Sequence, residues 1–168
     1  FAAADRGTLF LDEVAEMSPQ AQAMLLRFLE DGTYSRVGEA APRHADVRLV
    51  CATCRDLPRL VREGAFRQDL FYRIQGGCVR IPALRERADR ISLARAVLVG
   101  LVETRARKAG DRAGTSAASF VPELSPSAET WILTHGWPGN VRELKSALAH
   151  ALAVSGREAL GREHFPEP

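Results

Sequence analysis

The most constraining feature of this 168-residue chain is a short apolar run that ends in two acids, Gly7-Thr-Leu-Phe-Leu-Asp12-Glu13. Three apolar residues between a glycine and an acidic pair predict a buried strand with two carboxylates at its carboxyl end. Open α/β sheets bind their ligands at that edge. Asp12 could therefore be a hard oxygen ligand for phosphate-bound Mg²⁺, and Glu13 could position or activate a water that attacks a phosphate. The alternative is a strand that simply ends in an acidic turn.

Composition places the chain among ordinary globular proteins, with 46% hydrophobic and 26% charged residues. Its net charge of +2 is too small to imply a polyanionic partner. The sequence has neither an apolar run of about 20 residues nor a signal-peptide pattern at its start, so we expect a cytoplasmic protein without a membrane partner. The spacing Cys51-Ala-Thr-Cys54 allows a redox or zinc interpretation. A zinc site would need a second ligand pair, which the sequence lacks, and a thioredoxin-like motif would begin a helix, whereas Cys51 ends a strand-like run. We therefore predict that the cysteines have a structural role in a reducing cytosol.

Capping and breaking signals predict the elements of the first half. Ser18 and Pro19 begin a helix that ends just before Gly32. Further elements are predicted on the same grounds: strands over 33–37 and 47–52, a helix capped by Asp56 that runs to about Glu63, a second helix over 66–74, and a strand over 78–81.

From about Leu84 onward the pattern is helical only. A long amphipathic helix is predicted over 88–109, a loop over 110–123, and a helix from Ser125-Pro126 to His135. A Gly-Trp-Pro-Gly turn follows, and Asn140 is expected to cap the last helix. The chain is therefore predicted to join an α/β part to an all-helical part, with the boundary near residues 82–87.

Three further groups of residues are candidates for chemistry. The segment 52–57, at the end of a neighbouring strand, could direct a polar side chain towards the same region as Asp12, or it could be a simple corner capped by Asp56. Arg67 and Arg73 lie about 120° apart if both are helical, and could stabilise charge on a neighbouring subunit's phosphate or form a solvated face paired with Asp69. Arg142 falls in a first helical turn, where the helix dipole disfavours a cation, so it could reach a bound phosphate or pair with Glu143.

Taken in order, six sequence blocks resemble one family over nearly the whole chain. The family is the AAA+ ATPase domain of sigma-54-dependent transcriptional activators, the bacterial enhancer-binding proteins. The resemblance implies an α/β fold class, with part of a P-loop-type parallel sheet over 1–84 and an all-α lid over 85–168. The blocks are GTLFLDE, LLRFLEDGTYSRVG, DVRLVCATCRDL, FRQDLFYRI, RIPALRERADRI and WPGNVREL.

The resemblance also implies roles for particular residues. Asp12 and Glu13 match the Walker B pair, for Mg²⁺ and water activation, and the segment with Cys54 matches sensor I. Arg67 and Arg73 match arginine fingers that act in trans across a ring interface, and Arg142 matches the sensor II arginine of the lid. The cofactors would be ATP and Mg²⁺. The parent protein's partners would be the sigma-54 RNA polymerase holoenzyme, further copies in a ring, expected to be a hexamer, and enhancer DNA bound through a domain not present here.

The sequence also departs from the family pattern. Cys54 stands where the family usually has Asn or His, and a thiol is a weaker hydrogen-bonding group than an amide. Gln68 replaces an acid beside Arg67. The phosphate-binding motif G-x-x-x-x-G-K-[ST] and the GAFTGA loop do not occur in these 168 residues. In the family's sheet, the strand before that motif lies between those at 47–52 and 78–81, so we expect a C-terminal portion of the domain that does not hydrolyse ATP alone.

Two alternative functions remain open from the sequence. Residues 125–155 form a helix, a tight turn and a helix with Arg142, Lys145 and His150, an arrangement that helix-turn-helix DNA readers use. That electrostatic footprint is weak, and Glu143 offsets part of it. The chain could also be a purely structural module that mediates self-association.

Overall fold

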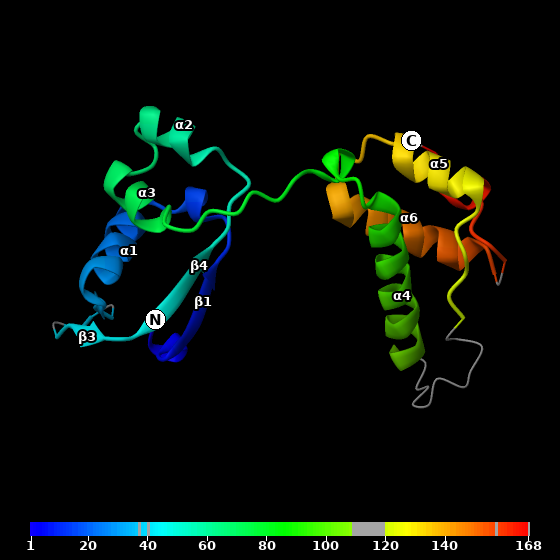
Figure 1. Cartoon of the computed structure of the whole chain (residues 1–168). Coiled ribbons are helices and arrows are strands. Elements are labelled where there is room, and N and C mark those ends of the chain that lie inside the picture. Colours follow the sequence, from blue (N-terminus) through cyan, green and yellow to red (C-terminus); the bar gives the residue numbers. More distant parts are fainter. Residues whose placement is uncertain (37, 40, 109–119, 157, 168) are drawn as a thin grey trace. The chain divides into compact units, whose positions relative to one another are not determined.

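The computed structural model describes residues 1–36, 38–39, 41–108, 120–156 and 158–167. The chain divides into two compact units, Phe1–Val79 and Arg80–Pro168. Figure 1 shows helices with strands in the first unit and helices in the second. In the described part of the chain, the helices are too short or too polar to cross a lipid bilayer.

The first unit is built on two parallel strands, β1 (Gly7–Leu11) and β4 (Val47–Cys51). They pair in register from Gly7 opposite Val47 to Leu11 opposite Cys51. The remaining elements are short strands β2 (Thr33–Tyr34) and β3 (Arg43–His44), which pair antiparallel, helices α1 (Pro19–Asp31), α2 (Leu57–Arg62) and α3 (Gln68–Ile74), and 3-10 turns η1 (Ala2–Ala4) and η2 (Val14–Glu16).

The capping residues of this unit act as predicted. The Ser18 hydroxyl accepts a hydrogen bond from the Ala21 amide at 3.2 Å, and the Asp56 carboxylate accepts one from the Arg59 amide at 3.1 Å. Gly32 ends α1 in the left-handed conformation, at φ 70°, which costs glycine little. The strand predicted at 33–37 is shorter: it covers Thr33–Tyr34, and residue 37 lies outside the described residues.

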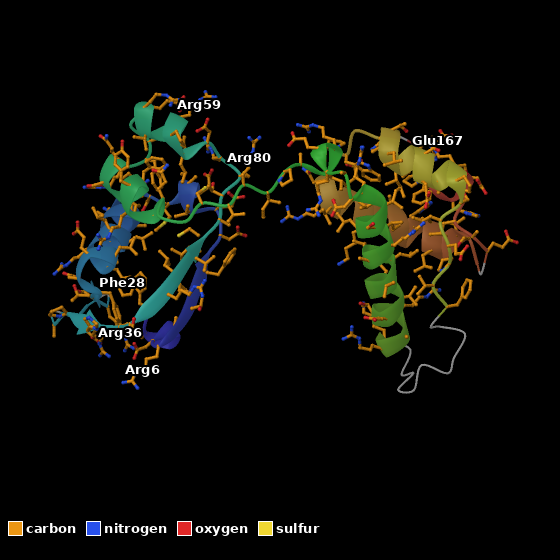
Figure 2. All side chains as sticks on the ribbon, viewed as in Figure 1. Arg6, Phe28, Arg36, Arg59, Arg80 and Glu167 are labelled. Atoms are coloured by element: carbon orange, nitrogen blue, oxygen red, sulfur yellow. The ribbon has the colours of Figure 1, made fainter. Side chains whose placement is uncertain are left out.

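The core of the first unit is small. The ring of Phe28, which Figure 2 labels, stacks on that of Phe1 with ring centroids 3.8 Å apart. The rings of Phe28 and Tyr34 meet edge to face, with centroids 6.4 Å apart. A buried cluster beside it holds α1, α2 and α3 together and consists of Val14, Leu25, Leu60, Phe66 and Leu70.

The predicted strand over 78–81 is wrong. These residues are irregular, and Val79 and Ile81 are 86% and 81% exposed. A strand needs a neighbouring backbone to satisfy its amides and carbonyls. Among the described residues the parallel sheet contains β1 and β4 and offers no strand beside 78–81. The apolar composition of the segment was a correct observation, but composition alone does not supply a pairing partner.

The second unit is helical, as predicted. Its main helices are α4 (Arg90–Lys108), α5 (Pro126–Thr134) and α6 (Asn140–Val154), accompanied by the 3-10 turns η3 (Leu84–Glu86) and η5 (Arg162–His164). The predicted loop over 110–123 falls mostly on 109–119, outside the described residues. The core is a large cluster of residues from α4, α5, α6 and η3 and from the segments that connect and follow them: Leu84, Ala94, Leu98, Val102, Leu124, Ala128, Ile132, Trp137, Leu144, Ala147, Leu148, Ala151, Leu152, Leu160 and Phe165.

The prediction that Asn140 caps the last helix is wrong. Gly139 occupies the capping position, and Asn140 is the first residue of α6, at φ 51°. The Asn140 side chain instead accepts a hydrogen bond from the Leu84 amide at 2.9 Å. An N-cap side chain normally accepts a hydrogen bond from an amide in the first turn of its own helix. Leu84 is distant in sequence, so tertiary packing brings its amide to Asn140.

Candidate functional site

The carboxyl edge of the parallel sheet brings two candidate segments together. Beyond the last strand residues, the Ala52 amide donates to the Leu11 carbonyl at 2.9 Å and the Val14 amide donates to the Ala52 carbonyl at 3.0 Å. These bonds continue the ladder past β1 and β4. The acidic pair therefore lies beside the segment 52–57, which the sequence indicated as a candidate.

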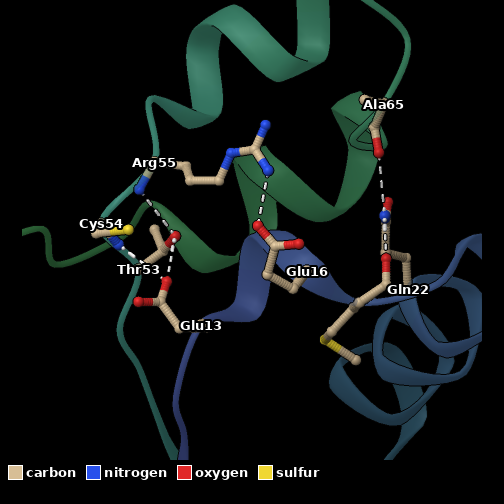
Figure 3. A network of polar contacts seen from close by, with 8 residues as sticks. Glu13, Glu16, Gln22, Thr53, Cys54, Arg55 and Ala65 are labelled. Atoms are coloured by element: carbon tan, nitrogen blue, oxygen red, sulfur yellow. Dashed lines mark hydrogen bonds and ion pairs between the residues drawn. The ribbon is translucent and has the colours of Figure 1, made fainter.

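Glu13 is the centre of this edge (Figure 3). Its Oε2 accepts hydrogen bonds from the Thr53 hydroxyl at 3.3 Å and from the Cys54 amide at 3.1 Å. Its backbone is left-handed, at φ 49° and ψ 50°, a conformation that costs a residue with a side chain free energy and that clusters at functional sites. The neighbouring Asp12 accepts a hydrogen bond from the Glu13 amide at 3.1 Å. Both acids are exposed.

Cys54 contributes in a way that its residue type did not predict. Its backbone amide, rather than a side-chain amide, holds Glu13. A hydrogen bond between its side chain and the Glu13 carboxylate, together with the negative charge of that carboxylate, raises the pKa of the thiol. A raised pKa lowers the share of the thiolate, which is the nucleophilic form of cysteine. The three cysteines, Cys51, Cys54 and Cys78, are all free thiols.

An ion pair fixes the outer side of the same edge. Arg55 Nη1 lies 2.7 Å from Glu16 Oε1, and the Arg55 amide donates to the Thr53 hydroxyl at 3.1 Å (Figure 3). Both charged side chains are about half exposed, so the pair adds little free energy of folding. Its consequence is geometric, because it joins the turn after β1 to the turn after β4.

Arg67 does not lie within a helix, so the angular argument made for it is wrong. It precedes α3 at φ −69° and ψ 132°, where it occupies the capping position. Its guanidinium makes a bidentate contact with Asp69, at 3.0 and 2.7 Å, and holds the pKa of that carboxyl below its usual range. This is the pairing that the solvated-face interpretation expected. Arg67, Gln68, Asp69 and Tyr72 line an open surface hollow.

Gln22 is the residue of this region that sequence reasoning missed. Gln22 is 1% exposed, and its Nε2 donates to the Ala65 carbonyl at 3.2 Å (Figure 3) and to the Met17 carbonyl at 2.9 Å. Its Oε1 accepts a hydrogen bond from the Arg67 amide at 2.9 Å. The amide thereby fixes the backbone from which Arg67 projects. A signal was available, since Gln22 stands three residues before Leu25 on the apolar face of α1.

The other two arginines have different surroundings. Arg73 donates to the Leu29 carbonyl near the end of α1, at 2.8 and 3.3 Å. Arg142 lies in the second unit, in the first turn of α6. The sequence indicated Glu143 as an alternative ion-pair partner of Arg142. In the structure, the Glu143 carboxylate instead contacts His135 at 2.8 Å and the Gly139 amide at 2.7 Å. Among the described residues, no ion pair involves the Arg142 guanidinium.

Comparison with protein families gives a match for each part of the chain. Residues 1–80 match the Sigma-54 interaction domain, and residues 101–168 match the AAA+ ATPase lid domain.

Three relatives match most of the chain, and two of them, TyrR and AlgB, are named as transcriptional regulatory proteins. The chain is 43% identical over 152 residues to the HTH-type transcriptional regulatory protein TyrR of Salmonella typhimurium, 38% over 167 residues to the nitrogen fixation protein AnfA of Azotobacter vinelandii, and 39% over 162 residues to AlgB of Pseudomonas aeruginosa. These matches cover 90%, 99% and 96% of this chain. The chain spans 28%, 29% and 34% of those proteins, about a third of their length or less.

Solved structures resemble the chain along almost its whole length. NtrX from Brucella abortus, in complex with ATP, superposes with a TM-score of 0.80 at 30% identity, covering 97% of this chain and 35% of that one. Its complex with ADP gives a TM-score of 0.79. The predicted fold class, part of an AAA+ parallel sheet followed by a helical lid, is confirmed.

Proposed function

The chain belongs to the AAA+ family of sigma-54-dependent transcriptional activators, and on this basis we propose that it supplies the water-activating, finger and lid residues of an ATPase that drives transcription activation. The observation that carries the proposal is the junction of the Glu13 carboxylate with Thr53 and Cys54 at the carboxyl edge of β1 and β4. Open α/β sheets bind ligands at that edge.

The acidic pair fits a nucleotide-bound Mg²⁺. Among the described residues, no group of three or more His, Cys, Asp or Glu side chains could hold a metal ion. Mg²⁺ needs no such group, because it is usually held by one or two carboxylates together with substrate phosphates. Asp12 would hold the ion, which supplies charge neutralisation at the phosphates. Glu13 would orient a water and accept its proton, while Thr53 and the Cys54 amide keep the carboxylate in place.

The arginines would stabilise the negative charge of the triphosphate. Gln22 holds the Arg67 backbone, which suits a finger offered to a neighbouring copy. The Arg73 guanidinium donates to the Leu29 carbonyl and would exchange that bond for a phosphate. For Arg67 this requires exchange of its Asp69 partner for a phosphate, a stronger acceptor of charge-assisted bonds. Arg142, without an ion-pair partner among the described residues, would contact the nucleotide from the lid.

The partners follow from the same proposal. Copies of the parent protein would assemble into a ring, a hexamer, whose substrate is the sigma-54 RNA polymerase holoenzyme, and enhancer DNA would bind through another domain. A cytoplasmic location follows, and the free thiols of Cys51, Cys54 and Cys78 suit that reducing compartment.

The test has two arms on the purified chain 1–168. Titration with Mg·ATP, followed by NMR, is expected to perturb the amides of Asp12, Glu13 and Cys54 and to do so less in Asp12→Asn. A matched control is Glu39→Gln, which removes an exposed acid paired with Arg43. An unperturbed acidic pair overturns the proposal.

The second arm measures hydrolysis. Because the 168 residues contain no G-x-x-x-x-G-K-[ST] motif to cradle phosphates, we expect no turnover above buffer. Turnover that Glu13→Gln abolishes would overturn the expectation of inactivity while supporting the role of Glu13. Turnover that survives Glu13→Gln would contradict both.

A further inference from the structure

The turn before α6 has a strained backbone, and several side-chain contacts hold it in place. Trp137 and Asn140 both have left-handed backbones, at φ 49° and 51°, and neither is glycine. Such conformations persist where surrounding contacts over-determine them, and they concentrate at active sites, ligand clamps and switch regions. The Trp137 side chain is fully buried, and its Nε1 donates to the Ile132 carbonyl at 2.8 Å. Asn140 is anchored by the Leu84 amide at 2.9 Å.

Glu143 makes the third attachment, with both of its carboxylate oxygens. Oε1 lies 2.8 Å from His135 Nε2, and Oε2 accepts a hydrogen bond from the Gly139 amide at 2.7 Å. One carboxylate therefore joins the end of α5, the turn and the start of α6. The contact with Gly139 is so close that a Cβ there would lie 2.8 Å from the Glu143 Cβ, which explains the glycine at this position.

His135 is itself held in place. Its ring centroid lies 5.0 Å from that of Trp131 and 4.6 Å from that of Trp137, and its side chain is 17% exposed. Burial opposes ionisation of Glu143, but the hydrogen bonds from His135 and Gly139 prevail and keep the pKa of its carboxyl below the usual value. Glu143 is therefore an anionic acceptor, whose hydrogen bonds are stronger than those of a neutral group.

We infer that Glu143 is a positioning residue for Arg142. The two residues are adjacent, so the contacts of Glu143 with His135 and Gly139 fix the backbone from which the Arg142 guanidinium projects, while leaving that guanidinium without an ion-pair partner among the described residues. The nucleotide contact of Arg142 rests on the proposed function; the positioning itself does not.

The first measurement needs no nucleotide. Amide hydrogen exchange in the chain 1–168 is expected to accelerate at Gly139 at least tenfold in Glu143→Ala, with lower backbone order at Arg142 by ¹⁵N relaxation. Glu143→Gln, which keeps an acceptor oxygen, should restore part of the protection. Glu129→Ala is the matched control, because Glu129 is an ion-paired acid of the same unit whose partner is the exposed Arg95. Unchanged exchange at Gly139, or unchanged order at Arg142, overturns the inference.

The second measurement separates this inference from the proposed function. Mg·ATP is added while the Arg142 Nε–H signal is followed, and its response is expected to need several-fold more nucleotide in Glu143→Ala than in the original chain. An equal response in both overturns the positioning role and leaves the proposed function standing. If the original chain shows no response at Arg142 while Gly139 exchange still depends on Glu143, the positioning is supported and the nucleotide role of Arg142 fails.

Discussion

The two units differ in how completely their own residues bury their apolar surface. In the second unit, α4, α5 and α6 pack around one large core that includes fully buried Trp137, Leu144 and Leu148. In the first unit, Phe10 and its register partner Val50 lie on the same sheet face and remain 57% and 37% exposed. Parallel strands are normally covered on both faces. Helices can complete a core with near neighbours, whereas a parallel sheet depends on elements that come from elsewhere in a chain.

The largest effect should come from Trp137→Ala in the second unit. Loss of a fully buried indole and of its hydrogen bond to Ile132 should lower the free energy of unfolding of that unit by about 3–5 kcal/mol. Urea unfolding followed by Trp131 fluorescence reports this unit alone, because both tryptophans of the chain lie in it. A loss below 1 kcal/mol would contradict a tightly packed lid core.

A somewhat smaller loss is expected in the first unit from Gln22→Leu. The change leaves the Arg67 amide and the Met17 and Ala65 carbonyls without their buried partner, at a cost of about 2–4 kcal/mol. Far-UV circular dichroism during urea unfolding should show an earlier first transition, while the tryptophan transition stays in place. Gln20→Leu, an exposed position on the same helix, is the control. Equal losses for both variants would show that the Gln22 amide is not needed.

Acid should weaken the turn of the second unit. The pKa of Glu143 lies below its usual value of 4.5 because hydrogen bonds from His135 and Gly139 outweigh the effect of burial. Because the pKa is lowered in the folded state, the ionised carboxylate stabilises the fold fully at pH values above the ordinary pKa of 4.5. This contribution disappears as the pH falls through the folded-state pKa. The stability difference between the original chain and Glu143→Gln, followed by tryptophan fluorescence, should therefore shrink in acid. A difference that is constant with pH would contradict the anionic contact.

The smallest effect should come from Phe10→Ser on the exposed sheet face. A side chain that contacts mainly solvent should change the free energy of unfolding by no more than about 0.5 kcal/mol. Val14→Ser, on the buried side of the same unit, is the matched comparison and should cost several times more. A large loss in Phe10→Ser at high protein concentration, absent on dilution, would show that a second copy covers this face.

The candidate site was predictable where local sequence sets geometry. The sequence indicated that two polar segments, the acidic end of 7–13 and the segment 52–57, lie at one edge of the sheet. Parallel strands have their carboxyl ends at the same edge, as β1 and β4 do. Ser18 and Asp56 cap helices as expected, since a cap needs only an amide three residues away, and Ser125 caps the helix that was predicted to begin there. The resemblance of six ordered blocks supplied the family, and the family comparisons confirmed it.

Long-range partners were not predictable from the sequence. Asn140 bonds to Leu84, Gln22 to Ala65 and Arg67, and Glu143 to His135, and each choice required knowing which distant group would be close and unsatisfied. The apolar segment 78–81 failed for the same reason, because a strand exists only where a neighbouring backbone pairs with it. The sequence by itself determined where most helices lie, the caps at Ser18 and Asp56, and the acidic strand end, because these depend on residues a few positions apart. Only the tertiary structure decided which polar groups hold Glu13, Arg67 and the base of Arg142, because a buried hydrogen bond depends on packing between distant segments.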